Sequence, residues 1–185
     1  MADPFSMLES DHRQVEQLLR QLDESEEGPE RERLVGQLTA ALSVHMEFEE
    51  AHIYPLTREV LDEETAEEAN TEHELARDGV GKLSQLTSEP GFGAAVAMMD
   101  GGIKHHAKEE EGEVFPAMRR NLDRQQQSDL CRQLVQTKRD AGLLADSLEY
   151  ATKDDLVDLA TDLNLEVKSS MTKAEVSDLV MSAGG

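Results

Sequence analysis

The strongest constraint on the fold of this 185-residue chain is an internal repeat. When the sequence is shifted by 61 residues, the separation of His12 from His73, identical polar residues coincide and apolar positions fall on apolar positions. The coinciding pairs include His12 with His73, His45 with His106, Glu49 with Glu110, Pro55 with Pro116, Leu19 with Val80, and Leu42 with Ile103. One helical hairpin has therefore been used twice. Two such hairpins predict an antiparallel up-and-down four-helix bundle with an approximate twofold axis.

The spacing of apolar residues and the turn signals outline the helices of an all-α chain. We expect helices over about residues 4–23, 29–61, 65–86, 93–122 and 124–150, with Pro55 and Pro116 kinking or ending the second and fourth. Aromatic residues make up 3% of the chain and Trp is absent, so an all-β fold is not expected. The first predicted domain spans residues 1–150 and consists of the bundle and a fifth helix.

Residues 151–185 form the second predicted domain, a small helical appendage with a repeat of its own. Thr152 and Thr172 each predict a helix start, because Thr is a good N-cap and an acidic residue follows three positions later. With an extended link at residues 164–167, the segment resembles the SAP-like and Rho N-terminal-like modules, which often bind nucleic acid in other proteins. Here the acidic residues outnumber the lysines. Docking onto the bundle or onto a protein partner is therefore expected instead.

The charge of the chain argues against several classes of partner. Its 18 Lys and Arg oppose 40 Asp and Glu, which gives a formal net charge of −22. Nucleic acid and anionic membrane surfaces are therefore poor partners, and no stretch is long and apolar enough to span a membrane. The single cysteine, Cys131, cannot form an internal disulfide, and the N-terminus has no basic stretch followed by an apolar run. We therefore expect a cytoplasmic protein.

The repeated histidines and glutamates fall on helix faces that we expect to be buried. In each hairpin a His-x3-Glu pair lies one turn apart on one face and continues an apolar stripe. The pairs are His45 with Glu49 and His106 with Glu110, and the single histidines within the other apolar stripes are His12 and His73. Burying carboxylates without a counter-charge costs several kcal/mol each, whereas a bound cation removes this cost. Four imidazoles and two carboxylates without Cys suit iron or manganese, and six ligands suit two bridged ions better than one.

These motifs resemble those of the hemerythrin-like, or HHE cation-binding, family over about residues 5–149. The resemblance rests on Asp11-His12, His45-x3-Glu49-Glu50 through Tyr54-Pro55, Glu72-His73, and His106-x3-Glu110-Glu111 through Phe115-Pro116. It implies a non-haem centre of two iron ions with an oxo or hydroxo bridge, while the donor types alone leave manganese open. By the same resemblance, the nitrogen ligands are His12, His45, His73 and His106, and the bridging carboxylates are Glu49 and Glu110.

One departure from the family pattern bears on the chemistry. Oxygen-carrying members have a fifth histidine one turn after the third-helix histidine, and this chain has Arg77 there. Two histidines, two carboxylate oxygens and one solvent bridge leave each ion an open position. This departure disfavours reversible carriage of dioxygen. Two adjacent open positions instead favour reaction with hydrogen peroxide, with catalase-like turnover, and the centre would also be able to bind dioxygen or nitric oxide. The competing hypothesis is a non-enzymatic iron, oxygen or redox sensor that signals through a protein partner.

Two further side chains are candidates for the open position. His52 follows Glu49 by three residues on the same face, and its equivalent in the repeat is a glutamate. Tyr54 pairs with Phe115; regular helical geometry points it away from the site, but Pro55 disfavours that geometry here. For both, the competing interpretation is packing or surface exposure. The acidic residues beside the ligands are interpreted as a solvated charged face, made of Glu47, Glu50, Glu109 and Glu111.

Overall fold

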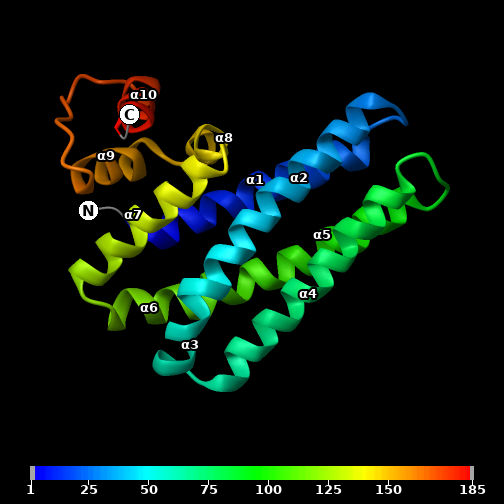
Figure 1. Ribbon diagram of the computed structural model, residues 1–185, viewed down its shortest axis with the longest axis horizontal. Coiled ribbons are helices and arrows are strands. Elements are labelled where there is room, and N and C mark those ends of the chain that lie inside the picture. Colours follow the sequence, from blue (N-terminus) through cyan, green and yellow to red (C-terminus); the bar gives the residue numbers. More distant parts are fainter. Residues whose placement is uncertain (1–2, 184–185) are drawn as a thin grey trace. The chain divides into compact units, whose positions relative to one another are not determined.

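The computed structural model describes residues 3–183, and the regular structure in this range is entirely helical (Figure 1). The α-helices are α1 (Pro4–Glu24), α2 (Pro29–Phe48), α3 (Tyr54–Val60), α4 (Glu63–Leu86), α5 (Phe92–Glu109), α6 (Phe115–Asn121), α7 (Arg124–Asp140), α8 (Leu144–Tyr150), α9 (Lys153–Asp162) and α10 (Lys173–Ser182). Two π-helical turns, η1 (Glu49–Ile53) and η2 (Glu110–Val114), join α2 to α3 and α5 to α6. The predicted all-α fold is confirmed. Residues 1–2 and 184–185 of the predicted domains lie outside the described residues.

The chain divides into two compact units, and the boundary between them falls within α1 and within α6. One unit runs from His12 to Met118 and contains two helical hairpins, α1 with α2 and α4 with α5. In this unit the hairpins form the predicted antiparallel bundle, in which α4 packs against α5, α2 and α3. The other unit comprises the residues up to Asp11 and from Arg119 onward. The domain boundary at residue 150 stays a prediction.

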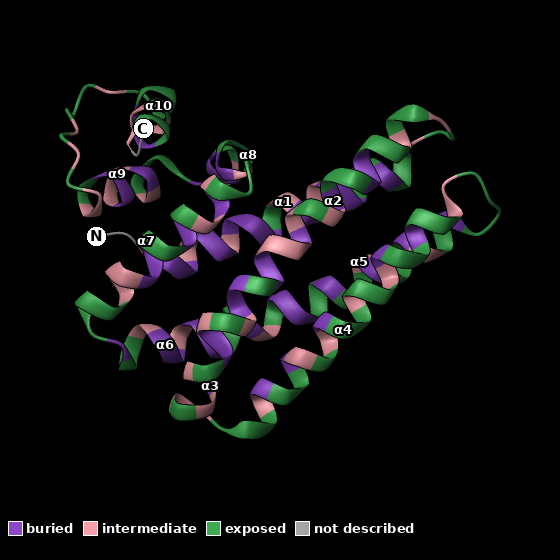
Figure 2. Cartoon of the chain, in the orientation of Figure 1, coloured by how far each residue is buried: buried purple, intermediate pink, exposed green. Residues whose placement is uncertain are grey.

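Apolar stripes on the long helices build the core of the bundle. Buried residues from each long helix meet in one cluster, among them Leu19 of α1, Leu38 of α2, Leu83 of α4 and Val96 of α5. Exposed positions follow the opposite side of each helix, so buried and exposed residues alternate along the ribbons (Figure 2). Because polar residues recur along every long helix, no helix within residues 3–183 is long and apolar enough to cross a membrane.

The repeated prolines are accommodated by a widened helical turn. Pro55 has no N–H to donate, and its ring crowds the carbonyl one turn earlier in a regular helix. The chain forms the π turn η1 at this point, and the N–H of Tyr54 donates to the carbonyl of Glu49. The helix then continues as α3, so the predicted interruption at Pro55 is a π turn. The second hairpin repeats this geometry at η2, ahead of Pro116.

A buried ion pair stabilises the other unit. Lys138 Nζ of α7 lies 2.6 Å from Asp11 Oδ2, and Ser147 Oγ of α8 donates to Asp11 Oδ1 at 2.7 Å. None of the three residues is more than 3% exposed. The carboxylate of Asp11 therefore ties α7 and α8 to the start of α1, a link that the sequence analysis does not predict.

The C-terminal helices begin where the sequence predicts. The hydroxyl of Thr152 accepts from the N–H of Asp155, whose carboxylate accepts from the N–H of Thr152. Thr172 and Glu175 form the same reciprocal pair at the start of α10. Residues 163–172 connect α9 to α10 without forming a strand. The resemblance of this segment to SAP-like modules stays a prediction.

Candidate metal centre

The six repeated histidines and glutamates meet inside the bundle, beside the two π turns. They are His12 from α1, His45 from α2, Glu49 from η1, His73 from α4, His106 from α5 and Glu110 from η2. Each of these residues is at most 5% exposed. The structure therefore brings together all six residues that the sequence analysis assigns to one site.

The four imidazoles form two pairs. The rings of His12 and His45 have their centroids 4.9 Å apart, and those of His73 and His106 are 4.8 Å apart. Between the pairs, the ring centroids of His12 and His106 are 6.3 Å apart. In the second pair, the two Nε2 atoms face each other at 3.2 Å.

Each of the two glutamates reaches one histidine of each pair. The contacts join Oε2 to Nε2, at 3.1 Å for Glu49 and His45, 3.4 Å for Glu49 and His73, 3.3 Å for Glu110 and His12, and 3.4 Å for Glu110 and His106. The pattern obeys the repeat, because each glutamate contacts the histidine one turn before it and the single histidine of the other hairpin. The two carboxylates thus lie between the two imidazole pairs.

The outer nitrogens of three histidines are held by further carboxylates. The Nδ1 contacts are 2.8 Å from His12 to Glu111, 2.9 Å from His73 to Glu50, and 2.8 Å from His106 to Glu72. Because an ionised carboxylate only accepts, Nδ1 carries the proton in each contact. In the neutral form of each ring, the lone pair of Nε2 is then directed to the centre, as in metal-binding histidines that a carboxylate orients.

The outer carboxylates correct one interpretation of the sequence. Glu50 and Glu111 are not simply part of a solvated charged face, because each holds a histidine. The repeat contains a signal for this role, since Glu50 and Glu111 have the same separation as the histidines that they contact. Glu72 directly precedes His73 in the sequence, but its carboxylate contacts His106 of the neighbouring helix α5.

Tyr54 lies beside the central histidines and glutamates, where both ligation and packing stay predictions for this residue. Its hydroxyl is 2.8 Å from Nε2 of His73 and donates to Oε1 of Glu110 at 3.2 Å. Five residues separate Tyr54 from Glu49, which in a regular α-helix places the two side chains about 140° apart. The π turn closes over these five residues and brings them onto one face. Pro55 in the sequence predicts that the regular helix is interrupted here, but it does not predict that the interruption is a π turn.

His52 and Arg77 lie outside the group of central residues. The ring of His52 packs against Phe48 with 4.8 Å between centroids, and His52 belongs to none of the converging ligand groups among the described residues. Arg77 Nη2 lies 2.7 Å from Oε1 of Glu50, the oxygen that also contacts His73 Nδ1. Arg77 thus contacts the carboxylate of Glu50. It occupies the position at which oxygen-carrying members of the hemerythrin-like family have a histidine.

The histidines beside Glu110 bind protons more tightly than usual. Burial alone would lower the pKa of His12, but attraction to Glu110 and Glu111 outweighs burial and raises this pKa to about 9. Burial also opposes the charged form of His106, and the carboxylates of Glu110 and Glu72 raise its pKa above the ordinary value. Without a cation, protons on these rings balance the buried carboxylates.

The pKa values of Glu49 and Tyr54 are shifted in opposite directions. Burial opposes the charged form of Glu49, but the positive charge and contact of His45 hold its pKa well below the usual range. Burial and the negative charge of Glu110 raise the pKa of Tyr54, so its phenol stays protonated. The centre therefore contains the ionised carboxylate of Glu49 and a neutral phenol.

The donor set fits a cation. Within residues 3–183, several central atoms are buried and make no hydrogen bond: His12 Nε2, both oxygens of Glu49, and Glu110 Oε2. Such atoms are costly unless a partner satisfies them. Candidate ligand atoms within 4.8 Å of one another form two overlapping groups, one of His12, His45, His106 and Glu110, and one of Glu49, His73 and His106. Imidazole and carboxylate donors without thiolate suit iron or manganese.

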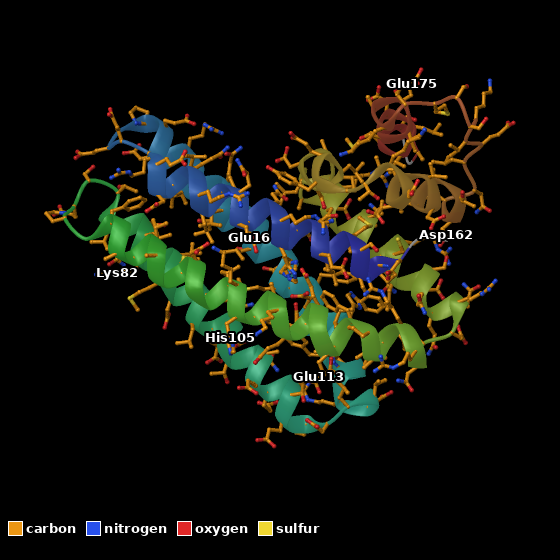
Figure 3. The ribbon with its side chains drawn as sticks, turned by 180° about the vertical axis from the view of Figure 1, so that it is seen from behind. Glu16, Lys82, His105, Glu113, Asp162 and Glu175 are labelled. Carbon is orange, nitrogen blue, oxygen red and sulfur yellow. The ribbon has the colours of Figure 1, made fainter. Side chains whose placement is uncertain are left out.

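A small acidic hollow of about 90 Å³ lies against one side of the centre. Glu68, Glu109 and Glu113 line it together with the central residues His106 and Glu110. Glu113, a residue of η2, is labelled in Figure 3. The concentration of carboxylates makes this side of the centre attractive to cations.

The fold and the centre define a helical metal-binding protein, and comparison with known families identifies its class. Residues 3–118 match the family model "Hemerythrin HHE cation binding domain", so the chain belongs to this family. The chain is also similar to a protein named "DNA nickase" from Nostoc sp. strain PCC 7120, with 26% identity over 121 residues. That alignment covers 65% of this chain and 34% of the nickase, so the chain spans about a third of that relative. No solved structure gave a significant match.

Proposed function

We propose that the centre holds two iron ions bridged by Glu49 and Glu110. The observation that carries this proposal is the position of each carboxylate between the two histidine pairs. One histidine pair and one oxygen from each carboxylate form a ligand set, and the twofold repeat supplies a second set. A single ion would leave one imidazole pair inside the core without a cation, which makes a dinuclear centre the better use of six buried donors. Manganese is the alternative metal for the same donors.

We further propose that the centre reacts with hydrogen peroxide in a catalase-like manner. When bound, a pair of iron ions accepts and returns two electrons, which balances the conversion of two peroxide molecules into one dioxygen and two waters. The outer carboxylates support this by keeping the Nδ1 protons in place, so that the Nε2 lone pairs face inward. Dioxygen and nitric oxide are further small ligands that such a centre would bind.

Tyr54 supplies the protein's own proton-bearing group beside the proposed open position. Its hydroxyl lies within 3.2 Å of both His73 and Glu110 in the structure. The raised pKa keeps a proton on the hydroxyl oxygen, where it orients and hydrogen-bonds a small oxygen-containing ligand. Direct ligation by the phenolate is the alternative role of Tyr54.

A non-enzymatic sensor is the second candidate function, and Asp11 is the observation that favours it. Asp11 directly precedes His12 in the chain, and its carboxylate holds Lys138 of α7 and Ser147 of α8. A change of metal state that moves the backbone at His12 would therefore reach the C-terminal helices through Asp11. In this case the C-terminal segment would present the metal state to a protein partner.

The relative named DNA nickase raises action on DNA as another possibility for this chain. DNA binding depends mainly on neutralising phosphates with Lys and Arg. A net charge of −22 opposes such binding, so we do not propose that this chain nicks DNA. Incubation of supercoiled plasmid with metal-loaded protein in the absence of peroxide tests this: an accumulation of nicked circles would contradict our reading.

The proposed function is tested by metal content and oxygen evolution measured on the same samples. Metal-free protein is reconstituted with ferrous iron, analysed for iron per chain, and then mixed with peroxide at an oxygen electrode. We expect about two iron ions per chain and sustained oxygen release, both reduced in Glu49→Gln and both retained in the matched control Glu47→Gln, whose side chain is exposed. Full iron content without oxygen release, together with a partner interaction that His106→Ala alters, would favour the sensor.

A further inference from the structure

A large pocket leads away from the four histidines along the seam between α4 and α5. Its volume is about 520 Å³, and its lining extends on α4 from Glu72 to Lys82 and on α5 from Ala95 to His106. Figure 3 shows Lys82 toward the turn that joins these helices and His105 farther along α5, nearer the centre. The pocket is therefore elongated along the helix pair.

The size of this pocket exceeds the needs of peroxide or a diatomic gas. Pockets of about 300–1,000 Å³ are typical of sites for much larger organic ligands. The nine-residue separation from His73 to Lys82 corresponds to a length of about 13 Å along a helix. An elongated space of this length accommodates an extended hydrocarbon chain.

Small and apolar residues form most of the walls. Ala76 and Gly102 leave the space between the helices open, and an added Cβ at Gly102 would meet nothing within 4 Å. Two large apolar side chains of the lining are exposed, Leu75 at 66% and Met98 at 80%. Exposed apolar side chains gathered along one pocket are typical of a binding site.

The inner end of the pocket is polar. It is lined by His12, which is 4% exposed and whose Nε2 makes no hydrogen bond among the described residues. The other central histidines lie beside it. The pocket therefore offers polar groups at its inner end and mainly apolar contact along the remainder of its length, where Asp78 and Lys82 also line it.

We propose that this pocket binds a single-chain amphiphile of the fatty-acid type, with its polar end toward the central histidines and its chain along α4 and α5. Apolar contact along the chain provides the binding energy, and the inner histidines fix the orientation. Binding requires no bond to form or break. Hydroperoxides that carry such a chain would then be the substrate class of the centre, a step that rests on the proposed function.

The test uses a fluorescent fatty acid, cis-parinaric acid, titrated into metal-free and iron-loaded full-length protein. Gly102→Leu adds a side chain at a residue that lines the pocket, whereas Gly101→Leu adds the same side chain at a neighbouring residue outside the lining. Both glycines are exposed, and an added Cβ would meet nothing within 4 Å at either position. We expect saturable binding of one probe per chain for the wild type and Gly101→Leu, and at least tenfold weaker binding for Gly102→Leu. Circular dichroism and melting curves check that each variant is folded.

A second variant keeps the test decisive if Gly102→Leu does not fold. Leu75→Gln combined with Met98→Gln changes only exposed side chains of the lining, and we expect it to weaken probe binding several-fold. The absence of saturable binding to the wild type, or equal binding to both leucine variants, would overturn the proposal. A dimer that this double variant dissociates in sedimentation would also overturn it, because the seam would then be an interface between copies.

The failure of this proposal is distinguishable from failure of the proposed function. Iron content and oxygen release are measured on the same wild-type samples as probe binding. Probe binding without peroxide turnover would contradict the proposed reaction and support the proposed pocket. Peroxide turnover without probe binding would support the reaction and contradict the pocket.

Discussion

The two hairpins of the bundle contribute the same candidate metal-binding residues, but different residues surround them. Tyr54 of the first hairpin lies against His73 with 5.1 Å between ring centroids, and its equivalent Phe115 stacks on His12 at 6.0 Å. Each aromatic ring therefore covers a histidine of the other hairpin. The difference between the two contacts is a hydroxyl group, which only the Tyr54 side brings to the centre.

The charges outside the ligands also differ between the hairpins. Arg77 contacts Glu50, which orients His73, whereas the residue equivalent to Arg77 in the first hairpin is Glu16. Equivalent positions of the two hairpins thus carry opposite charges, positive at Arg77 and negative at Glu16. The comparison teaches that the repeat constrains the residues that would bind metal, while neighbouring positions have diverged enough to make the two halves chemically unequal.

Removal of a bridging carboxylate is the change with the largest expected effect. A carboxylate between two ions offsets positive charge on both, so Glu49→Ala and Glu110→Ala should each abolish at least one metal position. His12→Ala removes one bond to one ion and should retain two weakly bound ions, because water can take the vacated place. Iron analysis after reconstitution measures these differences. Two iron ions per chain in Glu49→Ala with unchanged turnover would exclude the bridging assignment.

Metal removal should destabilise both hairpins together. A ligand that binds only the folded state at 100 times its Kd stabilises that state by about 3 kcal/mol. We expect chelation to lower the melting temperature by roughly 5–10 °C for a chain of this size. Hydrogen exchange should increase in α2 and α5, which supply the His-x3-Glu pairs. Equal melting of the two forms would show that the six buried groups satisfy one another without metal.

The sequence predicts that the six histidines and glutamates meet at one place, because the repeat tests each residue twice. Six polar residues at matching positions on two apolar faces are difficult to explain by any other structure. The same reasoning finds the four-helix bundle and the starts of α9 and α10, since apolar spacing and Thr caps are local signals.

The remaining features depend on geometry that local signals do not specify. The π turn that brings Tyr54 to the centre follows from how the backbone relaxes around Pro55. The pairing of Lys138 with Asp11 joins residues far apart in the sequence. The pocket between α4 and α5 arises from the absence of side chains at positions such as Gly102, and a sequence pattern gives little information about such empty space.

The pH dependence of the metal-free protein should separate the two carboxylates. The folded-state pKa of His12, about 9, exceeds its ordinary value of 6.5. Its contribution of about 3 kcal/mol is therefore fully present below pH 6.5 and is lost as the pH rises through about 9. Glu110→Gln should flatten this dependence because Glu110 is a main cause of the shift, whereas Glu49→Gln should retain the part due to His12. Urea unfolding of metal-free protein between pH 6 and 10 measures the effect, and identical profiles for the two variants would contradict it.

The outer carboxylates should show a smaller and unequal effect. Replacing the carboxylate that orients a metal-binding histidine typically weakens metal binding by about 10–100-fold. The side chain of Glu50 is less exposed than that of Glu111, 30% against 41%, so solvent screens its contacts with His73 and Arg77 less, and we expect Glu50→Gln to weaken iron binding more than Glu111→Gln does. Competition with a chelator of known affinity gives both constants, and Glu47→Gln is the exposed control. A larger loss in Glu111→Gln would contradict the role of solvent screening.

Exchange of the aromatic residues should give the smallest effect on stability and the sharpest test of the asymmetry. Tyr54→Phe removes the hydroxyl from His73 and Glu110 but keeps the ring that covers His73, so iron content should remain near that of the wild type. If the phenol binds iron directly, the phenolate-to-iron absorption band disappears; if it only carries a proton, the spectrum is retained and peroxide turnover falls by about 10²–10⁴-fold. The reciprocal variant Phe115→Tyr offers a hydroxyl beside His12, and the double variant transfers the phenol from one half to the other. Tyr54→Phe with unchanged spectrum and unchanged turnover would mean that Tyr54 only packs, and that the two hairpins are equivalent in chemistry as well as in framework.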